Sequence, residues 1–225
     1  MSAAGIIAIG DSLIRRPFGA MAGVQPQSFP SRLAELRGLP LETLWVPGAT
    51  VADVRDGLVP RVVGRHHLAI VSVGTANVRG GISERDFTLA LMKIIGELRN
   101  RCERIALVGI PHDADASRIV ADAAKVSGAV FIPFDLQGMR ELSSDRFHPT
   151  TLGHLALADQ AARALGYTAL PSHLAPRNGR GRVGVTYRLR QGLVAVLRAI
   201  FTPKALFGNR RVKQTGEPNP QDSAQ

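Results

Sequence analysis

The sequence predicts a three-layer α/β/α domain built around a five-stranded parallel sheet. Five short apolar runs recur at regular intervals along the first two thirds of the chain. Longer segments separate them, and in these segments apolar residues recur at i, i+3, i+4 and i+7, the spacing of an amphipathic helix. Alternating strands and helices favour a parallel sheet, because each crossover helix covers one face of the sheet.

The expected elements alternate in order along the chain. Each strand is assigned to a short apolar run, and each helix to the amphipathic segment that follows the run. The expected strands are residues 6–9, 41–46, 68–73, 105–110 and 129–133. The expected helices are "FPSRLAELRG", "VADVRDGLVPRVV", "SERDFTLALMKIIGELRNR", "DADASRIVADAAKVSG" and "TTLGHLALADQAARALG".

Length and charge divide the chain into a domain and a tail. With 225 residues, of which 45% are hydrophobic, the chain can bury one sizeable core. Residues 1–171, the expected domain, carry 18 Lys and Arg against 16 Asp and Glu, a net +2. Residues 172–225 carry 10 against 2, a net +8. The basic charge belongs to the tail, so the domain has no electrostatic reason to bind nucleic acid.

The tail combines three compositions. The stretch "LPSHLAPRNGRGRVG" is typical of a linker, and "VTYRLRQGLVAVLRAIF" predicts a basic amphipathic helix. Packing on the domain, docking on an anionic membrane surface, and binding to nucleic acid or a protein groove all remain open for this helix. The final "NRRVKQTGEPNPQDSAQ" is polar enough to be disordered.

The cysteine content and the N-terminal segment indicate the cellular compartment in which we expect the protein. The one cysteine, Cys102, excludes an internal disulfide and a Cys-based zinc site, and we expect it in or beside a helix. The segment before Asp11 has no basic stretch and only a short apolar run, so we expect no signal peptide and a cytoplasmic location. No window reaches the roughly 18 consecutive apolar residues that cross a bilayer.

Polar residues follow the expected strands at the edge where open α/β sheets bind ligands. Ser12 follows the first strand, Gly48 the second and Asn77 the third. Asp145 and His148 lie in "SDRFHPTT", beyond the fifth strand. These five residues are the candidate catalytic and substrate-binding residues.

Their residue types match the needs of a serine hydrolase. Such an enzyme uses a hydroxyl nucleophile, an imidazole base, a carboxylate that orients the base, and donors for the oxyanion. The three-residue spacing of Asp145 and His148 lets one turn present the carboxylate to one ring nitrogen, while the other ring nitrogen faces Ser12. Gly48 would offer its N–H and Asn77 its amide. Taken alone, Ser12 is more typical of a helix N-cap than of a nucleophile, and Asp145 and His148 are what favour the nucleophile.

The order "GDSL", "GAT", "GTAN" and "DRFHP" resembles the SGNH hydrolases, also called GDSL esterases and lipases. The resemblance covers roughly residues 4–167 and implies a flavodoxin-like sheet of order 2-1-3-4-5. It also implies hydrolysis through an acyl-enzyme without metal or cofactor. By position, Ser12 matches the nucleophile, His148 the base and Asp145 the orienting acid. The implied oxyanion hole comprises the Ser12 N–H, the Gly48 N–H and the Asn77 side chain.

Other polar residues have plainer expectations. We expect His66 and His67 in an exposed loop before the third strand, and His154 in a capping or surface role in the last helix. His112 and Asp113, at the end of the fourth strand, are candidates to line the pocket.

These observations favour a serine esterase of SGNH type that hydrolyses a small acyl ester. One alternative is a lysophospholipase or thioesterase at a membrane surface, if the tail docks there. Another is a catalytically silent binding module. The expected partner is a small-molecule ester, with an anionic membrane as a second candidate, and no cofactor or metal is expected.

Overall fold

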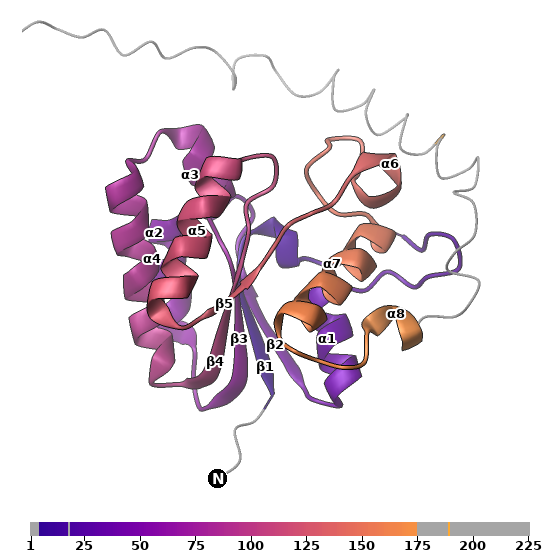
Figure 1. Cartoon of the computed structure of the whole chain (residues 1–225), viewed down its shortest axis with the longest axis horizontal. Coiled ribbons are helices and arrows are strands. Elements are labelled where there is room, and N and C mark those ends of the chain that lie inside the picture. The colour runs from indigo at the N-terminus through magenta and orange to yellow at the C-terminus, as the bar shows by residue number, and fades with distance from the viewer. Residues whose placement is uncertain (1–4, 18, 175–188, 190–225) are drawn as a thin grey trace, which may run out of the picture.

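A single parallel sheet forms the centre of the molecule (Figure 1). The computed structural model describes residues 5–17, 19–174 and 189. Its strands pair in the order β2-β1-β3-β4-β5, and each pairing is parallel. The strands are β1 (Ile6–Gly10), β2 (Leu41–Trp45), β3 (His66–Ser72), β4 (Cys102–Val108) and β5 (Val130–Ile132). The expected fold class and strand order are confirmed.

Helices cover both faces of this sheet, as Figure 1 shows. One face packs against α1 (Phe29–Arg37) and α7 (Thr151–Ala164). The other packs against α4 (Glu84–Arg99) and α5 (Ala114–Ser127). The shorter elements are η1 (Ser12–Ile14), α2 (Val51–Asp53), α3 (Thr75–Gly80), α6 (Gly138–Glu141) and α8 (Pro171–Leu174).

β1 is an interior strand, paired with β2 on one side and β3 on the other, and this position explains why its sequence is apolar without alternation. Ile6 and Ala8 pack in the core on the α1 and α7 face, whereas Ile7 and Ile9 pack on the α4 and α5 face. All four side chains are fully buried. A strand buried on both faces needs an apolar residue at every position.

Two strands begin earlier than predicted. His66 and His67 lie in β3 rather than in a loop, and His66 is buried. The His66 N–H donates to the Arg101 carbonyl (2.8 Å), so the backbone of this polar residue is already held beside β4. Cys102 is buried at the start of β4, so it lies in a strand, whereas we expected it in or beside a helix.

The helix predicted after β2 is divided. After α2 the chain continues as a π-helical turn, η2 (Val54–Leu58), and then a 3-10 turn, η3 (Val59–Arg61). Pro60 lies in the first turn of η3, where its missing N–H prevents the regular i to i−4 ladder from continuing.

The structure follows the chain as far as α8, which contacts α7 and α1. Apart from Leu189, the predicted amphipathic helix lies outside the described residues, as do most of the predicted linker and the final segment that we expect to be disordered. In the part of the chain that is described, no helix is both long enough and apolar enough to span a bilayer.

Candidate active site

The first part of the site is the turn at residues 10–14, where β1 ends. Gly10 has φ +149°, and a Cβ there would lie 1.8 Å from the Ser72 carbonyl oxygen of β3. Asp11 is the N-cap of η1, because its Oδ1 accepts from the Leu13 N–H (3.0 Å). Ser12 is therefore not the cap, and its hydroxyl is free for another contact.

Asp11 also connects this turn to β3 and α3. Its carboxylate is fully buried and accepts from the hydroxyls of Ser72 (3.2 Å) and Thr75. Burial raises the pKa of Asp11, although the hydrogen bonds from Thr75, Leu13 and Ser72 oppose the rise. The carboxylate thus ties the turn that carries Ser12 to the helix that carries Asn77.

The second part of the site is the loop at residues 143–148. Leu142 and Pro149 form an isolated antiparallel bridge at its base. Inside it, the Ser143 N–H donates to the His148 carbonyl and the Arg146 N–H donates to the Ser143 carbonyl, both at 2.8 Å. These contacts make a tight turn, with Arg146 in the left-handed region at φ +56°.

The two parts meet in a chain of hydrogen bonds. Ser12 Oγ lies 2.8 Å from His148 Nε2, and His148 Nδ1 lies 2.8 Å from Asp145 Oδ2. A carboxylate only accepts, so the Nδ1 atom carries the proton. Nε2 is then the acceptor for the Ser12 hydroxyl. Hydroxyl, imidazole and carboxylate are aligned for proton transfer from Ser12 to His148.

Asp145 is held by donors on its other oxygen. Oδ1 accepts from the Ser143 hydroxyl (2.6 Å) and from the N–H groups of Phe147 and His148 (3.0 Å each). Burial alone would raise the pKa of Asp145, but these hydrogen bonds and the one from His148 Nδ1 outweigh it and lower the pKa. The group stays ionised at neutral pH.

Candidate oxyanion donors lie at the ends of the neighbouring strands. Asn77, in α3 after β3, accepts the Val51 N–H on Oδ1 (2.7 Å), which leaves its NH2 group on the other side of the amide. Gly48 lies in the turn after β2 at φ +67°, and a Cβ there would meet nothing within 4 Å. Within the described residues, the N–H groups of Ser12 and Gly48 donate no hydrogen bond.

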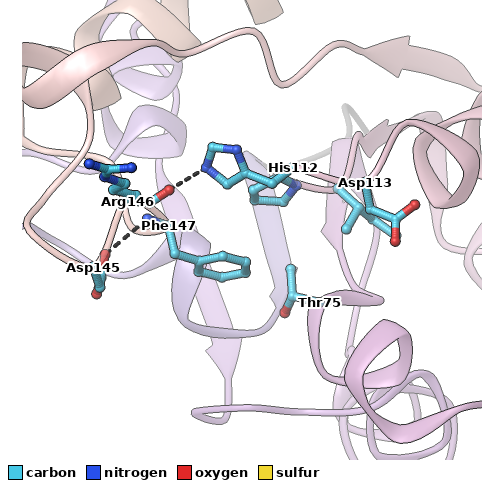
Figure 2. Close-up of a pocket in the computed structure, with 8 residues that line it drawn as sticks. Thr75, His112, Asp113, Asp145, Arg146 and Phe147 are labelled. Atoms are coloured by element: carbon cyan, nitrogen blue, oxygen red, sulfur yellow. Dashed lines mark hydrogen bonds between the residues drawn. The ribbon is translucent and has the colours of Figure 1, made fainter.

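A pocket of about 410 Å³ adjoins the Asp145 side of the site (Figure 2). His112 and Asp113 line it, as the sequence suggested. Phe147, which sequence reasoning missed although it stands within "DRFHP", also lines it and meets the His148 ring edge-on, with centroids 5.4 Å apart. The full lining is Thr75, Ile110, Pro111, His112, Asp113, Asp145, Arg146 and Phe147.

His154 is not at the surface, and the contact it makes satisfies the first N–H of α1. It is buried in α7, and its Nδ1 accepts from the Phe29 N–H (3.2 Å). Burial lowers its pKa to about 3, so the ring is neutral. As for metals, no group of three or more His, Cys, Asp and Glu side chains in the described part of the chain is arranged to hold one.

Comparison with known sequences identifies the family. The profile of the GDSL-like lipase/acylhydrolase family matches residues 8–156, which include every candidate residue named above. The chain belongs to this family. This GDSL hydrolase is accordingly a carboxylic ester hydrolase, as expected. Among curated proteins, none matches its sequence.

Solved structures share the fold of this GDSL hydrolase. An acetylxylan esterase from Geobacillus stearothermophilus is 16% identical with a TM-score of 0.55, over 74% of this chain and 97% of the esterase. A protein from Desulfitobacterium hafniense, described as a lipolytic protein of the G-D-S-L family, is 16% identical with a TM-score of 0.52, over 71% of this chain and 98% of its own. At these identities the likeness shows the fold alone.

Proposed function

We propose that this GDSL hydrolase cleaves a small acyl ester through an acyl-enzyme, with Ser12 as nucleophile, His148 as base and Asp145 as the acid that orients the base. The observation that carries the proposal is the pair of 2.8 Å contacts from Ser12 Oγ to His148 Nε2 and from His148 Nδ1 to Asp145 Oδ2. Residues far apart in sequence thereby form one relay of the kind that activates a serine hydroxyl.

In the acylation step, Ser12 Oγ attacks the carbonyl carbon of the ester while its proton passes to His148 Nε2. The ionised Asp145 carboxylate stabilises the imidazolium that forms. The carbonyl oxygen becomes an oxyanion, for which the Ser12 N–H, the Gly48 N–H and the Asn77 NH2 group are the proposed donors. Collapse of the oxyanion breaks the ester bond, and His148 returns the proton to the leaving alcohol.

Deacylation repeats these steps with water. His148 takes a proton from the water, the hydroxide attacks the acyl carbon, and the same donors hold the second oxyanion. Ser12 leaves with the proton from His148, and the carboxylic acid is released.

An acetyl ester is the first substrate to test. One structural relative is an acetylxylan esterase. This resemblance supports a short acyl group in the substrate of the present chain. The pocket beside Asp145 has charged and polar side chains from His112, Asp113 and Arg146 as well as the Phe147 ring. This mixed lining suits a small polar ester better than a long hydrocarbon chain.

The experiment measures the rates at which the wild type and Ser12→Ala hydrolyse p-nitrophenyl acetate, butyrate and octanoate. We expect fastest hydrolysis of the acetate and a loss of about 10⁴-fold or more in kcat for Ser12→Ala. Ser172→Ala, in α8, is the matched control and should behave as wild type. An inactive wild type, or an undiminished Ser12→Ala variant, would contradict the proposal. A preference for octanoate would instead favour the lysophospholipase or thioesterase alternative.

A further inference from the structure

His112 makes a contact that the proposed mechanism does not use. It lies between β4 and α5, and its Nε2 bonds the backbone carbonyl of Arg146 at the tip of the 143–148 loop (Figure 2). A carbonyl oxygen only accepts, so Nε2 carries a proton. Both the neutral Nε2–H tautomer and the imidazolium can donate, so the contact does not depend on the charge of His112.

The contact joins two unusual backbone positions. His112 has φ +58° and Arg146 has φ +56°, and the only other described non-glycine residue with positive φ is Ala22. Left-handed conformations are unfavourable for residues with a Cβ, and they persist where the surroundings determine them. His112 is anchored by its neighbours, because Asp113 caps α5 by accepting the Ala116 N–H (2.7 Å).

The carbonyl that His112 holds belongs to the same peptide group as the Phe147 N–H. That N–H donates to Asp145 Oδ1 (3.0 Å). A peptide group is planar, so fixing its oxygen also fixes the direction of its N–H. A hydrogen bond accepted at the oxygen further polarises the N–H as a donor. One peptide thus links His112 to the carboxylate that bonds His148.

We propose that His112 is a positioning residue for Asp145 and His148, acting through the Arg146–Phe147 peptide. The proposal rests on the proposed function, since it concerns the orientation of the relay that begins at Ser12. His112 anchors the loop tip to the β4–α5 connection, and the loop in turn presents the acid and the base.

The test uses two variants that tolerate the left-handed backbone. His112→Gly removes the donor and relieves the φ, so loss of thermal stability is not expected. His112→Asn keeps a shorter amide donor at a position where Asn is tolerated. His67→Ala is the matched control. His67 lies near the first residue of β3, at the end of the strand away from the candidate site, and it bonds Glu103.

We expect kcat to fall about tenfold or more in His112→Gly, with KM nearly unchanged and Tm not lowered. The rate at which a small fluorophosphonate labels Ser12 should fall by the same factor, since it reports activation of the nucleophile without an ester substrate. The downfield proton resonance of the Asp145–His148 hydrogen bond should exchange faster with solvent. His112→Asn should be intermediate, and His67→Ala should match wild type.

Unchanged kcat, labelling and proton exchange in His112→Gly would overturn the proposal. A rise in KM alone would also overturn it, because it would make His112 a pocket residue only. These outcomes differ from failure of the proposed function, in which the wild type itself would neither hydrolyse esters nor be labelled at Ser12.

Discussion

The 10–14 turn and the 143–148 loop hold the two ends of one hydrogen-bonded relay in opposite ways. In the turn, Asp11 and Leu13 are 0% and 1% exposed, and the Asp11 N–H donates to the Ser72 carbonyl of β3 (3.0 Å). In the loop, Arg146 is exposed and the Asp145 side chain is 24% exposed. The turn is held by the sheet, whereas the loop is held largely by bonds among its own residues.

This difference predicts different responses to mutation. A change that disturbs the turn also disturbs the packing of β1 against β3, so stability and activity should fall together. A change in the loop can disrupt the orientation of His148 while the sheet and its helices remain packed. Activity should then fall without unfolding.

The largest expected effect is on activity, from Asp145→Asn. The Asn oxygen can still accept from the Phe147 and His148 N–H groups, but the NH2 group cannot accept from His148 Nδ1. The imidazole is then driven to the wrong tautomer, and kcat should fall about 10⁴-fold. Steady-state kinetics with p-nitrophenyl acetate measures the loss, and circular dichroism checks that the variant is folded. A loss below about tenfold would mean that Asp145 does not orient the base.

The next effect is on the free energy of unfolding, from Gly10→Ala in the turn. The added Cβ would lie 1.8 Å from the Ser72 carbonyl oxygen, and neither backbone can move without breaking the β1–β3 pairing. We expect a loss of about 3 kcal/mol or more. Urea unfolding measures it. Wild-type stability with normal activity would show that the turn is not held by the sheet as described.

A smaller effect concerns the pH dependence of stability through Asp145. Its pKa is lower in the folded chain than the unfolded value of about 3.9, so the ionised carboxylate stabilises the fold at neutral pH. That contribution is lost as the pH falls from about 4 toward the folded pKa. Asp145→Asn should therefore be about 1 to 3 kcal/mol less stable than wild type at pH 7, with a smaller difference at pH 3. A constant difference at both pH values would contradict this.

The contrast also explains how far the sequence could predict the structure. The strand ends that carry Ser12, Gly48 and Asn77 were predictable because buried parallel strands are continuous apolar runs. The pairing of Asp145 with His148 was predictable because it is local. The early starts of β3 and β4 were missed, since His66 and Cys102 open strands whose apolar signal begins only later. Strand pairing there depends on backbone bonds that side-chain patterns do not reveal.

Other misses arise from tertiary burial and from backbone conformation. His154 looked like a surface residue, yet its bond to the Phe29 N–H is made between two helices that meet only in the fold. The sequence also did not show which of two neighbouring residues caps the turn: Ser12 taken alone was typical of an N-cap, whereas Asp11 is the cap in the structure. The left-handed conformation of His112 was also missed, because positive φ is uncommon for any non-glycine residue, even though His is among the types enriched there.

The smallest expected effect on the free energy of unfolding is at Arg146, which, like Gly10 in the turn, has a positive φ. Arg146→Gly removes a Cβ from a left-handed residue and keeps the carbonyl that His112 bonds. The relief at φ +56° offsets the greater flexibility of glycine in the unfolded chain, so stability should stay within about 1 kcal/mol of wild type. Urea unfolding beside Gly10→Ala compares the two positions directly. A loss at Arg146 as large as that at Gly10 would mean that the loop, like the turn, is held by packing against the rest of the fold.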